Sequence, residues 1–164
     1  MQIKSQYEYK GRIYKVTYND GVSKDVVIGG GVHCYCFYKD KLILVGYSNS
    51  DSWTPPGGGI EKGETYEEAA IREIKEESNM KVLWMECIGY QDVEVVNNKN
   101  IKERQYRMVC VVEPYGDFES DPDEDISEIK LIDPKDYKKY IKWGEIGDYL
   151  ITRAMKMKEK YFKP

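Results

Sequence analysis

The sequence predicts an α/β protein that forms one domain, residues 1–164. Runs of alternating apolar and polar residues, the pattern of half-buried β-strands, occur in both halves of the chain. Two amphipathic helices are expected among them, one between Thr65 and Asn79 and one from Glu145 to Phe162. The 164 residues, of which 41% are hydrophobic, are enough to bury a core and fit the usual size of one domain.

At the N-terminus, residues 3–18 alternate around a Lys10-Gly11 turn, which predicts a β-hairpin. We treat residues 1–24 as a hairpin extension of the domain. Such a hairpin forms either a simple edge of the sheet, the interpretation we favour, or a surface that pairs with a second subunit in a homodimer.

Two β-rich runs follow, Val26 to Tyr38 and Leu42 to Tyr47. The three glycines at 29–31 precede an alternating strand and not a helix, so they indicate close strand packing and not a phosphate cradle. His33 is the only histidine, and no serine or cysteine is placed beside it as a nucleophile. We interpret it as a strand residue, which leaves activated water as the expected nucleophile of a hydrolytic reaction.

The helix that starts near residue 65 has defined ends. Thr65 and Glu68 have the spacing of a capping box, and Asn79 lies where a left-handed C-terminal cap is expected. The apolar stripe that should pack on the core consists of Ala70, Ile71 and Ile74.

Three carboxylates share one side of this helix. Glu73, Glu76 and Glu77 stand at positions i, i+3 and i+4. Like charges at this spacing destabilise a helix by about 0.2–0.5 kcal/mol per pair, and a bound divalent cation would remove the repulsion. Clustered carboxylate oxygens suit Mg²⁺ or Mn²⁺, so the helix is a candidate metal site. The alternative is an exposed acidic helix.

One spacing links the glycine-rich turn to the helix: G-x5-E-x7-R-E-U-x-E-E-x-G-U, where U is apolar. Ile74 and Met80 fill the U positions, and Asn79 replaces the second glycine, a conservative change because asparagine accepts the left-handed conformation. The polar and glycine positions are met by Gly58, Glu64, Arg72, Glu73, Glu76 and Glu77. The segment resembles the signature of the Nudix hydrolase family.

This resemblance implies a three-layer α/β/α sandwich with a mixed central sheet, and a hydrolase that acts on acid anhydrides. The substrate is then a nucleoside diphosphate linked to another moiety X, and water attacks phosphorus with the help of Mg²⁺ or Mn²⁺. Arg72 is expected to pair with Glu64 and to orient Glu73, a candidate base. The implied metal ligands are the carbonyl of Gly57 and the side chains of Glu73, Glu76 and Glu77.

An acidic loop at residues 114–125 offers another candidate base. It is too polar to be packed, and it precedes a strand expected from Ile129 to Ile132. By the resemblance, a loop near this point supplies a further carboxylate, which we place at Glu124, within Asp123–Asp125. A solvated run of charges explains the same residues.

Substrate contacts are expected from two arginines and two aromatic residues. Arg104 and Arg107 lie on a strand from Arg104 to Glu113, the second half of a long hairpin that begins at Val82 and breaks at Gly89. They are candidate phosphate contacts, with solvated strand charges as the alternative. Candidates for stacking on a base are Tyr47 and Trp53.

The composition indicates which classes of partner and which cellular compartment to expect. A net charge of −4 makes a nucleic-acid partner unlikely, and no apolar stretch is long enough to cross a membrane. The four cysteines form no CxxC pair and are expected to be reduced thiols, so we expect a cytoplasmic protein.

Two functions of different class fit these residues. One is a metal-dependent pyrophosphohydrolase, and the alternative is a catalytically silent Nudix-fold sensor or binding module for nucleotide metabolites. A sensor would more naturally have lost one of the three glutamates, so we favour the enzyme.

Overall fold

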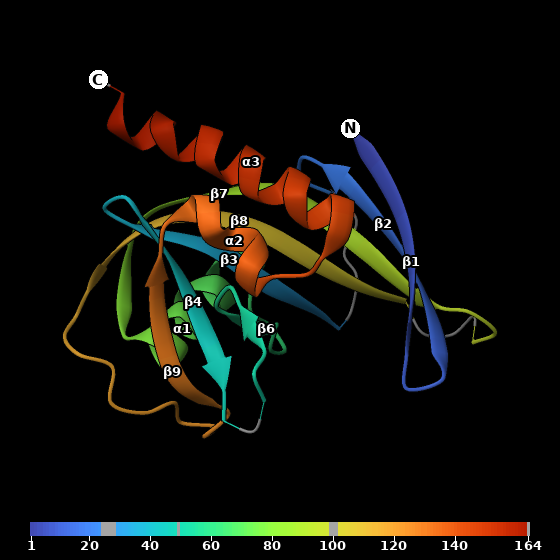
Figure 1. The fold of residues 1–164 in the computed structure, drawn as a ribbon, viewed down its shortest axis with the longest axis horizontal. Coiled ribbons are helices and arrows are strands. Elements are labelled where there is room, and N and C mark those ends of the chain that lie inside the picture. The colour runs from blue at the N-terminus through green and yellow to red at the C-terminus, as the bar shows by residue number, and fades with distance from the viewer. Residues whose placement is uncertain (24–28, 49, 99–101, 164) are drawn as a thin grey trace.

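The computed structural model describes residues 1–23, 29–48, 50–98 and 102–163. A mixed β-sheet lies between two helical layers, with α3 (Gly144–Phe162) on one face and α1 (Tyr66–Ser78) on the other (Figure 1). The predicted α/β/α sandwich is therefore confirmed. A 3₁₀ turn, Pro134–Asp136, and the short helix α2 (Tyr137–Tyr140) precede α3.

Within the described residues, nine strands form one sheet in the order β1-β2-β7-β8-β3-β4-β5, with β6 paired to β3 and β9 to β4. Only the β3–β8 pair is parallel among the pairs that the described residues form. The strands are β1 (Gln2–Tyr9), β2 (Arg12–Asp20), β3 (Gly30–Tyr38), β4 (Lys41–Tyr47), β5 (Trp53–Thr54), β6 (Gly57–Gly59), β7 (Met80–Val95), β8 (Lys102–Pro114) and β9 (Ile126–Ile132).

The N-terminal hairpin forms as predicted. Lys10 and Gly11 adopt φ of 50° and 73°, which suits a two-residue turn between antiparallel strands. β2 pairs with β7, so the hairpin extends the sheet and leaves β1 at its edge. Residue 24, the end of the expected extension, lies outside the described residues, as do the expected strand positions 26–28 and part of the turn at 97–100.

The glycines at the start of β3 allow close strand packing. A Cβ at Gly30 would lie 2.5 Å from the carbonyl oxygen of Arg104, and one at Gly31 would lie 3.0 Å from that of Gly58. The expected break at Gly89 is a register shift between Cys87 and Gly89, where a side chain would collide with Tyr18 and the Asn19 backbone. Both predictions are confirmed.

The core has two parts because successive strand residues face opposite sides of the sheet. In β3, Tyr35 and Phe37 pack under α3, whereas Cys34 and Cys36 pack against α1. All four cysteines are free thiols, and Cys34, Cys36 and Cys110 are buried. None of the described helices combines the length and apolar character needed to cross a membrane.

Candidate active site

The helix of the site, α1, is fixed at both ends by local hydrogen bonds. The Thr65 hydroxyl accepts from the Glu68 N–H at 3.1 Å, and the Glu68 carboxylate accepts from the Thr65 N–H at 2.9 Å. Asn79 adopts φ 52° and ψ 38° and donates its N–H to the Lys75 carbonyl. The predicted capping box and left-handed cap are confirmed. Because both ends of the helix are fixed, the directions in which the carboxylates between them point are fixed as well.

Two of these carboxylates face the protein interior. Glu73 and Glu77 are 9% and 7% exposed and share the buried face of α1 with Ala70 and Ile74. The expected stripe was wrong at Ile71, which is 47% exposed. The helix is rotated so that the sheet covers the carboxylate side, and Ile71 falls on the solvent side.

Arg72 holds the carboxylates and the glycine-rich turn together. It donates to Glu64 from two nitrogens, at 2.8 and 2.9 Å, and to the Gly59 carbonyl at 2.8 Å. Its remaining nitrogen donates to Glu73 at 2.7 Å and to Glu76 at 3.3 Å. The expected pairing of Arg72 with Glu64 and Glu73 is confirmed, and the hydrogen bond to Glu64 is the main cause that raises the Arg72 pKa.

Glu77 contacts the backbone of the glycine-rich turn. Its Oε2 accepts the Gly57 N–H at 3.0 Å. Gly57 faces His33 in the antiparallel β3–β6 ladder, and because its N–H points away from β3, its carbonyl points to the same side. A side chain at 57 would overlap the Val32 carbonyl, so glycine is required there.

Burial and mutual repulsion make these carboxyl groups weak acids. Burial raises the pKa of Glu77 to about 8, opposed by the Gly57 N–H and reinforced by the charges of Glu73, Asp121 and Glu76. Burial also raises the pKa of Glu73, while Arg72 opposes the rise. The site therefore has a surplus of negative potential that a cation would relieve.

The donor set fits a hard divalent cation in its chemistry, since Glu73, Glu76 and Glu77 supply carboxylate oxygens. In the part of the chain that the structure describes, however, no three His, Cys, Asp or Glu side chains converge in a geometry that could hold a metal ion. Glu73 and Glu76 are turned toward Arg72, and Glu77 toward Gly57. Each of these contacts uses one oxygen of the carboxylate, Oε1 of Glu73 and Oε2 of Glu76 and of Glu77, so the second oxygen of each group can bind a metal ion while the contact is kept.

The acidic loop is more ordered than its composition predicted. Asp121 is 4% exposed and accepts from the N–H groups of Asp123 and Ile126, so the expectation of an unpacked loop was wrong at this residue. The charges of Asp121 and Asp123 act on Glu77 and Glu73 respectively. Glu124 is exposed with φ 58°, and its carbonyl accepts from Ser48. The Asp-Pro-Asp turn at 121–123 was the sequence signal for this arrangement.

The two aromatic candidates lie in different surroundings. Tyr47, 39% exposed at the end of β4, has a pKa raised by burial and then by the charges of Glu77, Asp125 and Glu73, so its phenol lies within range of the negative charge of the carboxylates. Trp53 instead packs edge-on against Tyr140, and the Lys130 ammonium lies 4.6 Å from its ring centroid. Its ring is occupied by the protein itself.

The two arginines of β8 are buried, 6% exposed at Arg104 and 2% at Arg107, so solvated charges are excluded. Arg104 forms two hydrogen bonds with Asp92, at 2.7 and 2.9 Å, and is thus neutralised. Arg107 contacts His33 Nδ1 at 2.8 Å and donates to Gln105 at 2.9 Å. Its Nε has no hydrogen-bond partner among the described residues.

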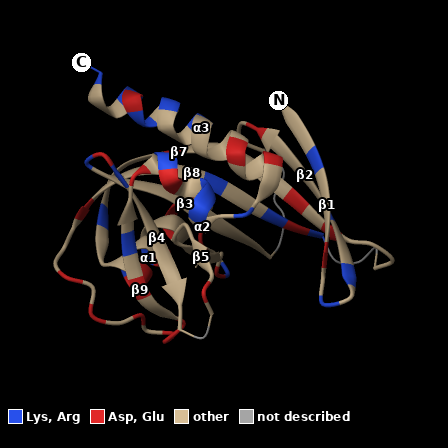
Figure 2. Cartoon of the chain, in the orientation of Figure 1, with Lys and Arg blue, Asp and Glu red and all other residues tan. Residues whose placement is uncertain are grey.

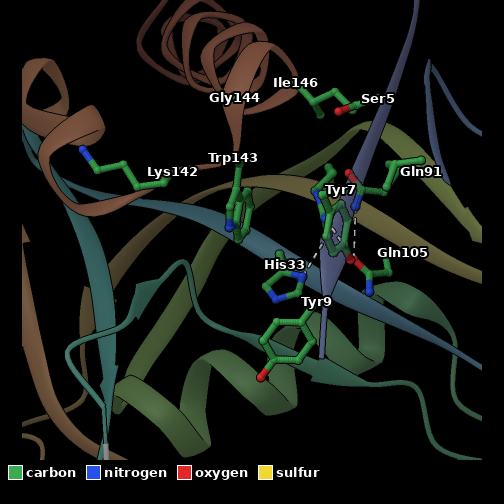
Figure 3. Close-up of a pocket in the computed structure, with 12 residues that line it drawn as sticks. Ser5, Tyr7, Tyr9, His33, Gln91, Gln105, Lys142, Trp143, Gly144 and Ile146 are labelled. Atoms are coloured by element: carbon green, nitrogen blue, oxygen red, sulfur yellow. Dashed lines mark hydrogen bonds between the residues drawn. The ribbon is translucent and has the colours of Figure 1, made fainter. Parts of the chain in front are cut away.

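A cavity of about 610 Å³ opens on the α3 side of the sheet beside Arg107 (Figure 3). The rings of Tyr7, Tyr9, His33 and Trp143 converge on it from the hairpin, from β3 and from the segment before α3. This cavity was not predicted from the sequence, although tyrosines at the alternate hairpin positions 7 and 9 were a signal for it. Its full lining is Ser5, Tyr7, Tyr9, Val16, His33, Gln91, Gln105, Arg107, Lys142, Trp143, Gly144 and Ile146.

The side chain of His33 lies in the cavity, and its backbone belongs to the β3–β6 ladder. Its ring lines the cavity, while its backbone lies opposite Gly57, whose N–H binds Glu77. Burial and the neighbouring Arg107 lower the pKa of His33 to about 3, so the ring is neutral. His33 is a strand residue, as predicted, and the sheet lies between the cavity, on the α3 side, and the carboxylates of α1, on the other side.

Residues 29–154 match the family model of the NUDIX domain. The chain belongs to the Nudix family. This match includes the glycine-rich turn, α1, the acidic loop and the first half of α3.

Two curated proteins are similar to the chain in sequence. The chain is 30% identical over 118 residues to the m7GpppN-mRNA hydrolase of Saccharomyces cerevisiae, which covers 71% of the chain but 12% of that protein. It is 35% identical over 83 residues to human diphosphoinositol polyphosphate phosphohydrolase 2, covering 48% of the chain and 43% of that protein. The chain thus spans less than half the length of these curated relatives.

A solved structure shares almost the whole Nudix fold. The Bacillus subtilis pyrophosphohydrolase BsRppH superposes with a TM-score of 0.73 at 17% identity, covering 93% of this chain and 97% of that one. At this identity the likeness establishes the fold.

Proposed function

We propose that this Nudix protein is a pyrophosphohydrolase that uses Mg²⁺ or Mn²⁺ to cleave the diphosphate linkage of a nucleoside diphosphate joined to another moiety X. The observation that carries the proposal is the carboxylate cluster of α1: Glu73 and Glu77 are buried, Arg72 holds Glu73, and the Gly57 N–H of the glycine-rich turn binds Glu77. A cavity of about 610 Å³, the usual size of a small-molecule site, lies on the α3 side of the sheet and is a candidate binding region of its own.

In this proposal the metal ligands are Glu73, Glu76, Glu77 and the Gly57 carbonyl. A cation bound there would offset phosphate charge and lower the pKa of a bound water. The protein's own part is positioning. Arg72, anchored by Glu64 and the Gly59 carbonyl, fixes the glycine-rich turn against α1 and orients Glu73.

Two carboxylates are proposed as the general base. Glu73 has a raised pKa, which favours proton transfer near neutral pH. Among the loop residues we expected Glu124. Asp123 is now the stronger candidate, because its charge is one of the causes of the raised Glu73 pKa and that of Glu124 is not among them, although both side chains are exposed.

The cavity favours a nucleotide over an inositol polyphosphate. Three aromatic rings line it, those of Tyr7, Tyr9 and Trp143, and they suit stacking on a base. The cations in its lining are Lys142 and Arg107, and Arg107 already binds His33 and Gln105. A ligand with several phosphates on one ring needs more unpaired cations than these two.

From the four expected substrate contacts we retain Arg107, in the cavity, and Tyr47, within range of the charge of the carboxylates. Arg104 and Trp53 are engaged by Asp92 and by Tyr140 with Lys130. A nucleic-acid partner has little support: along α3, acidic residues interrupt the lysines (Figure 2), and the net charge is −4. The free, mostly buried cysteines support a reducing, cytoplasmic location.

The test is hydrolysis of a panel of nucleoside polyphosphates, nucleotide sugars, dinucleotides and m7GpppN-capped RNA with Mg²⁺ or Mn²⁺. The wild type should release product from at least one compound, and Glu77→Gln should nearly abolish release, whereas Glu113→Gln, an exposed glutamate paired with Lys81, should not. Tight nucleotide binding without product from any compound would instead establish the sensor.

A further inference from the structure

The edge strand β1 has one unpaired side. It is eight residues long and pairs along its whole length with β2, from Gln2 opposite Asn19 to Tyr9 opposite Arg12. It stands at the end of the strand order, and the described residues place no strand on its other side. Such a strand offers a row of free N–H and C=O groups to another strand.

The ladder geometry identifies these free groups. Residues flanking a two-residue turn form a hydrogen-bonded pair, so Tyr9 and every second residue before it bond to β2. The hydrogen bond from the Asp20 N–H to the Met1 carbonyl, at 3.1 Å, follows the same alternation, because Met1 is an even number of residues from Tyr9. The outward groups therefore belong to Gln2, Lys4, Gln6 and Glu8.

We propose that β1 pairs antiparallel with β1 of a second copy of this chain, about a two-fold axis at Gln6, to form a homodimer. This register places Lys4 opposite Glu8 of the partner, and the symmetry creates that ion pair twice. Within the described part of the chain, neither Lys4 nor Glu8 has an oppositely charged partner.

Neighbouring registers lack this match. An axis at Ser5 sets Lys4 against Gln6, and an axis at Lys4 sets two lysines against each other. Another strand with only one partner among the described strands, β9, has a single lysine, Lys130, whose ammonium already lies over Trp53. The charge pattern of β1 thus selects a second β1 and one register.

The other face of the paired strands meets the cavity. Tyr7 and Tyr9, 49% and 56% exposed, line it and point to the same side as Ile3 and Ser5. In the dimer, the partner's Ser5 lies opposite Tyr7 and the partner's Ile3 opposite Tyr9. The second copy therefore extends the aromatic wall of the cavity.

Charge exchange tests the register. Sedimentation equilibrium of the full chain should show a concentration-dependent dimer. Lys4→Glu and Glu8→Lys should each weaken it by roughly tenfold or more, because two attractive pairs become repulsive, and the double variant should restore it. Lys156→Glu, the same charge change on the exposed side of α3 and far from β1 in the sequence, should have no effect.

A proline tests the backbone contact independently of charge. Gln6→Pro removes an outward N–H, which an edge strand tolerates, so the variant should stay folded and become monomeric. Tyr7→Pro removes a bond to β2 and should destabilise the hairpin itself. A wild type that is monomeric at every concentration, single charge variants that dimerise normally, or a double variant that stays monomeric would each overturn the proposal.

Discussion

Arg72 is the residue on which the geometry of the site depends most. Its three nitrogens bind Glu64, which precedes the helix, Glu73 on the helix, and the Gly59 carbonyl of the glycine-rich turn. A planar fork of donors can do this and a single ammonium cannot. The sequence predicted the pairing because the three side chains have a fixed spacing on a turn and the helix that follows it.

Arg72→Lys should therefore reduce kcat by roughly 10-fold to 100-fold, the usual cost of losing a supporting contact around a metal site, with the fold retained. Lysine cannot reach Glu64, Glu73 and the glycine-rich turn at once. Steady-state kinetics with a substrate identified by the panel measures this, and Arg12→Lys, an exposed change in the hairpin, is the control. Unchanged kcat would show that Arg72 serves stability alone.

His33 gives a pH dependence of stability. Its pKa is about 3 in the folded protein and ordinarily 6.5, so between these values the unfolded chain takes up a proton that the folded chain refuses. The contribution of neutral His33 to the free energy of unfolding is complete above pH 6.5 and is lost as the pH falls toward 3. The wild type should lose stability relative to His33→Gln between about pH 7 and pH 5, as measured by urea unfolding. Parallel curves would contradict a neutral His33.

At the scale of the element, α1 shows what local sequence determines and what it does not. Its caps depend on contacts three or four residues apart, and the sequence predicted both. The burial of Glu73 and the exposure of Ile71 depend on where the sheet lies, and there the prediction failed. The alternative that Arg107 is a solvated strand charge failed for the same reason, since a strand's alternation does not tell which of its faces is buried.

Glu77→Gln should separate stability from activity. Burial raises the pKa of Glu77 from its ordinary value of 4.5 to about 8. The stability that protonated Glu77 contributes is therefore fully present below pH 4.5 and is lost as the pH rises through 8. In metal-free buffer at alkaline pH the variant should have a higher Tm than the wild type, while hydrolysis with Mg²⁺ should fall by roughly 100-fold or more. Glu113→Gln should change neither. A lower Tm for Glu77→Gln would exclude repulsion among these carboxylates.

The acidic loop allows a direct comparison of two neighbouring carboxylates. If the loop supplies the base, Asp123→Asn should reduce kcat by roughly 10²-fold or more, because the charge of Asp123 contributes to the raised pKa of Glu73. Glu124→Gln should change little, because Glu124 is not among the charges that raise it. The reverse result would restore Glu124 as the candidate. Full activity in both variants would assign the base to Glu73.

At the scale of the whole molecule, the cavity is built by segments far apart in the chain. Tyr7, Gln91 and Trp143 come from the hairpin, β7 and the approach to α3. No short sequence pattern contains them together, which is why the fold and the carboxylates were predicted but the cavity was not. It exists only after the hairpin has joined the sheet at β7.

Trp143→Ala should weaken substrate binding and spare the chemical step. The Trp143 ring packs edge-on against His33 and lies 5.2 Å from the Arg107 guanidinium, so its loss removes a stacking surface. We expect KM to rise roughly tenfold or more with kcat little changed. Trp84→Ala, in a tryptophan that packs on Tyr161 elsewhere, controls for general destabilisation. A fall in kcat with unchanged KM would place Trp143 outside the binding region.

The cavity and the proposed metal site are formed by different stretches of the sequence, so each can be mutated without changing the other. Every residue in the cavity lining comes from outside 57–80, the stretch that carries the glycine-rich turn and the acidic helix. Mutations in the hairpin or before α3 can therefore alter which ligand is accepted without touching a proposed metal ligand. A library confined to Tyr7, Tyr9, Gln91 and Trp143 is thus a direct route to altered ligand preference on an unchanged hydrolytic apparatus.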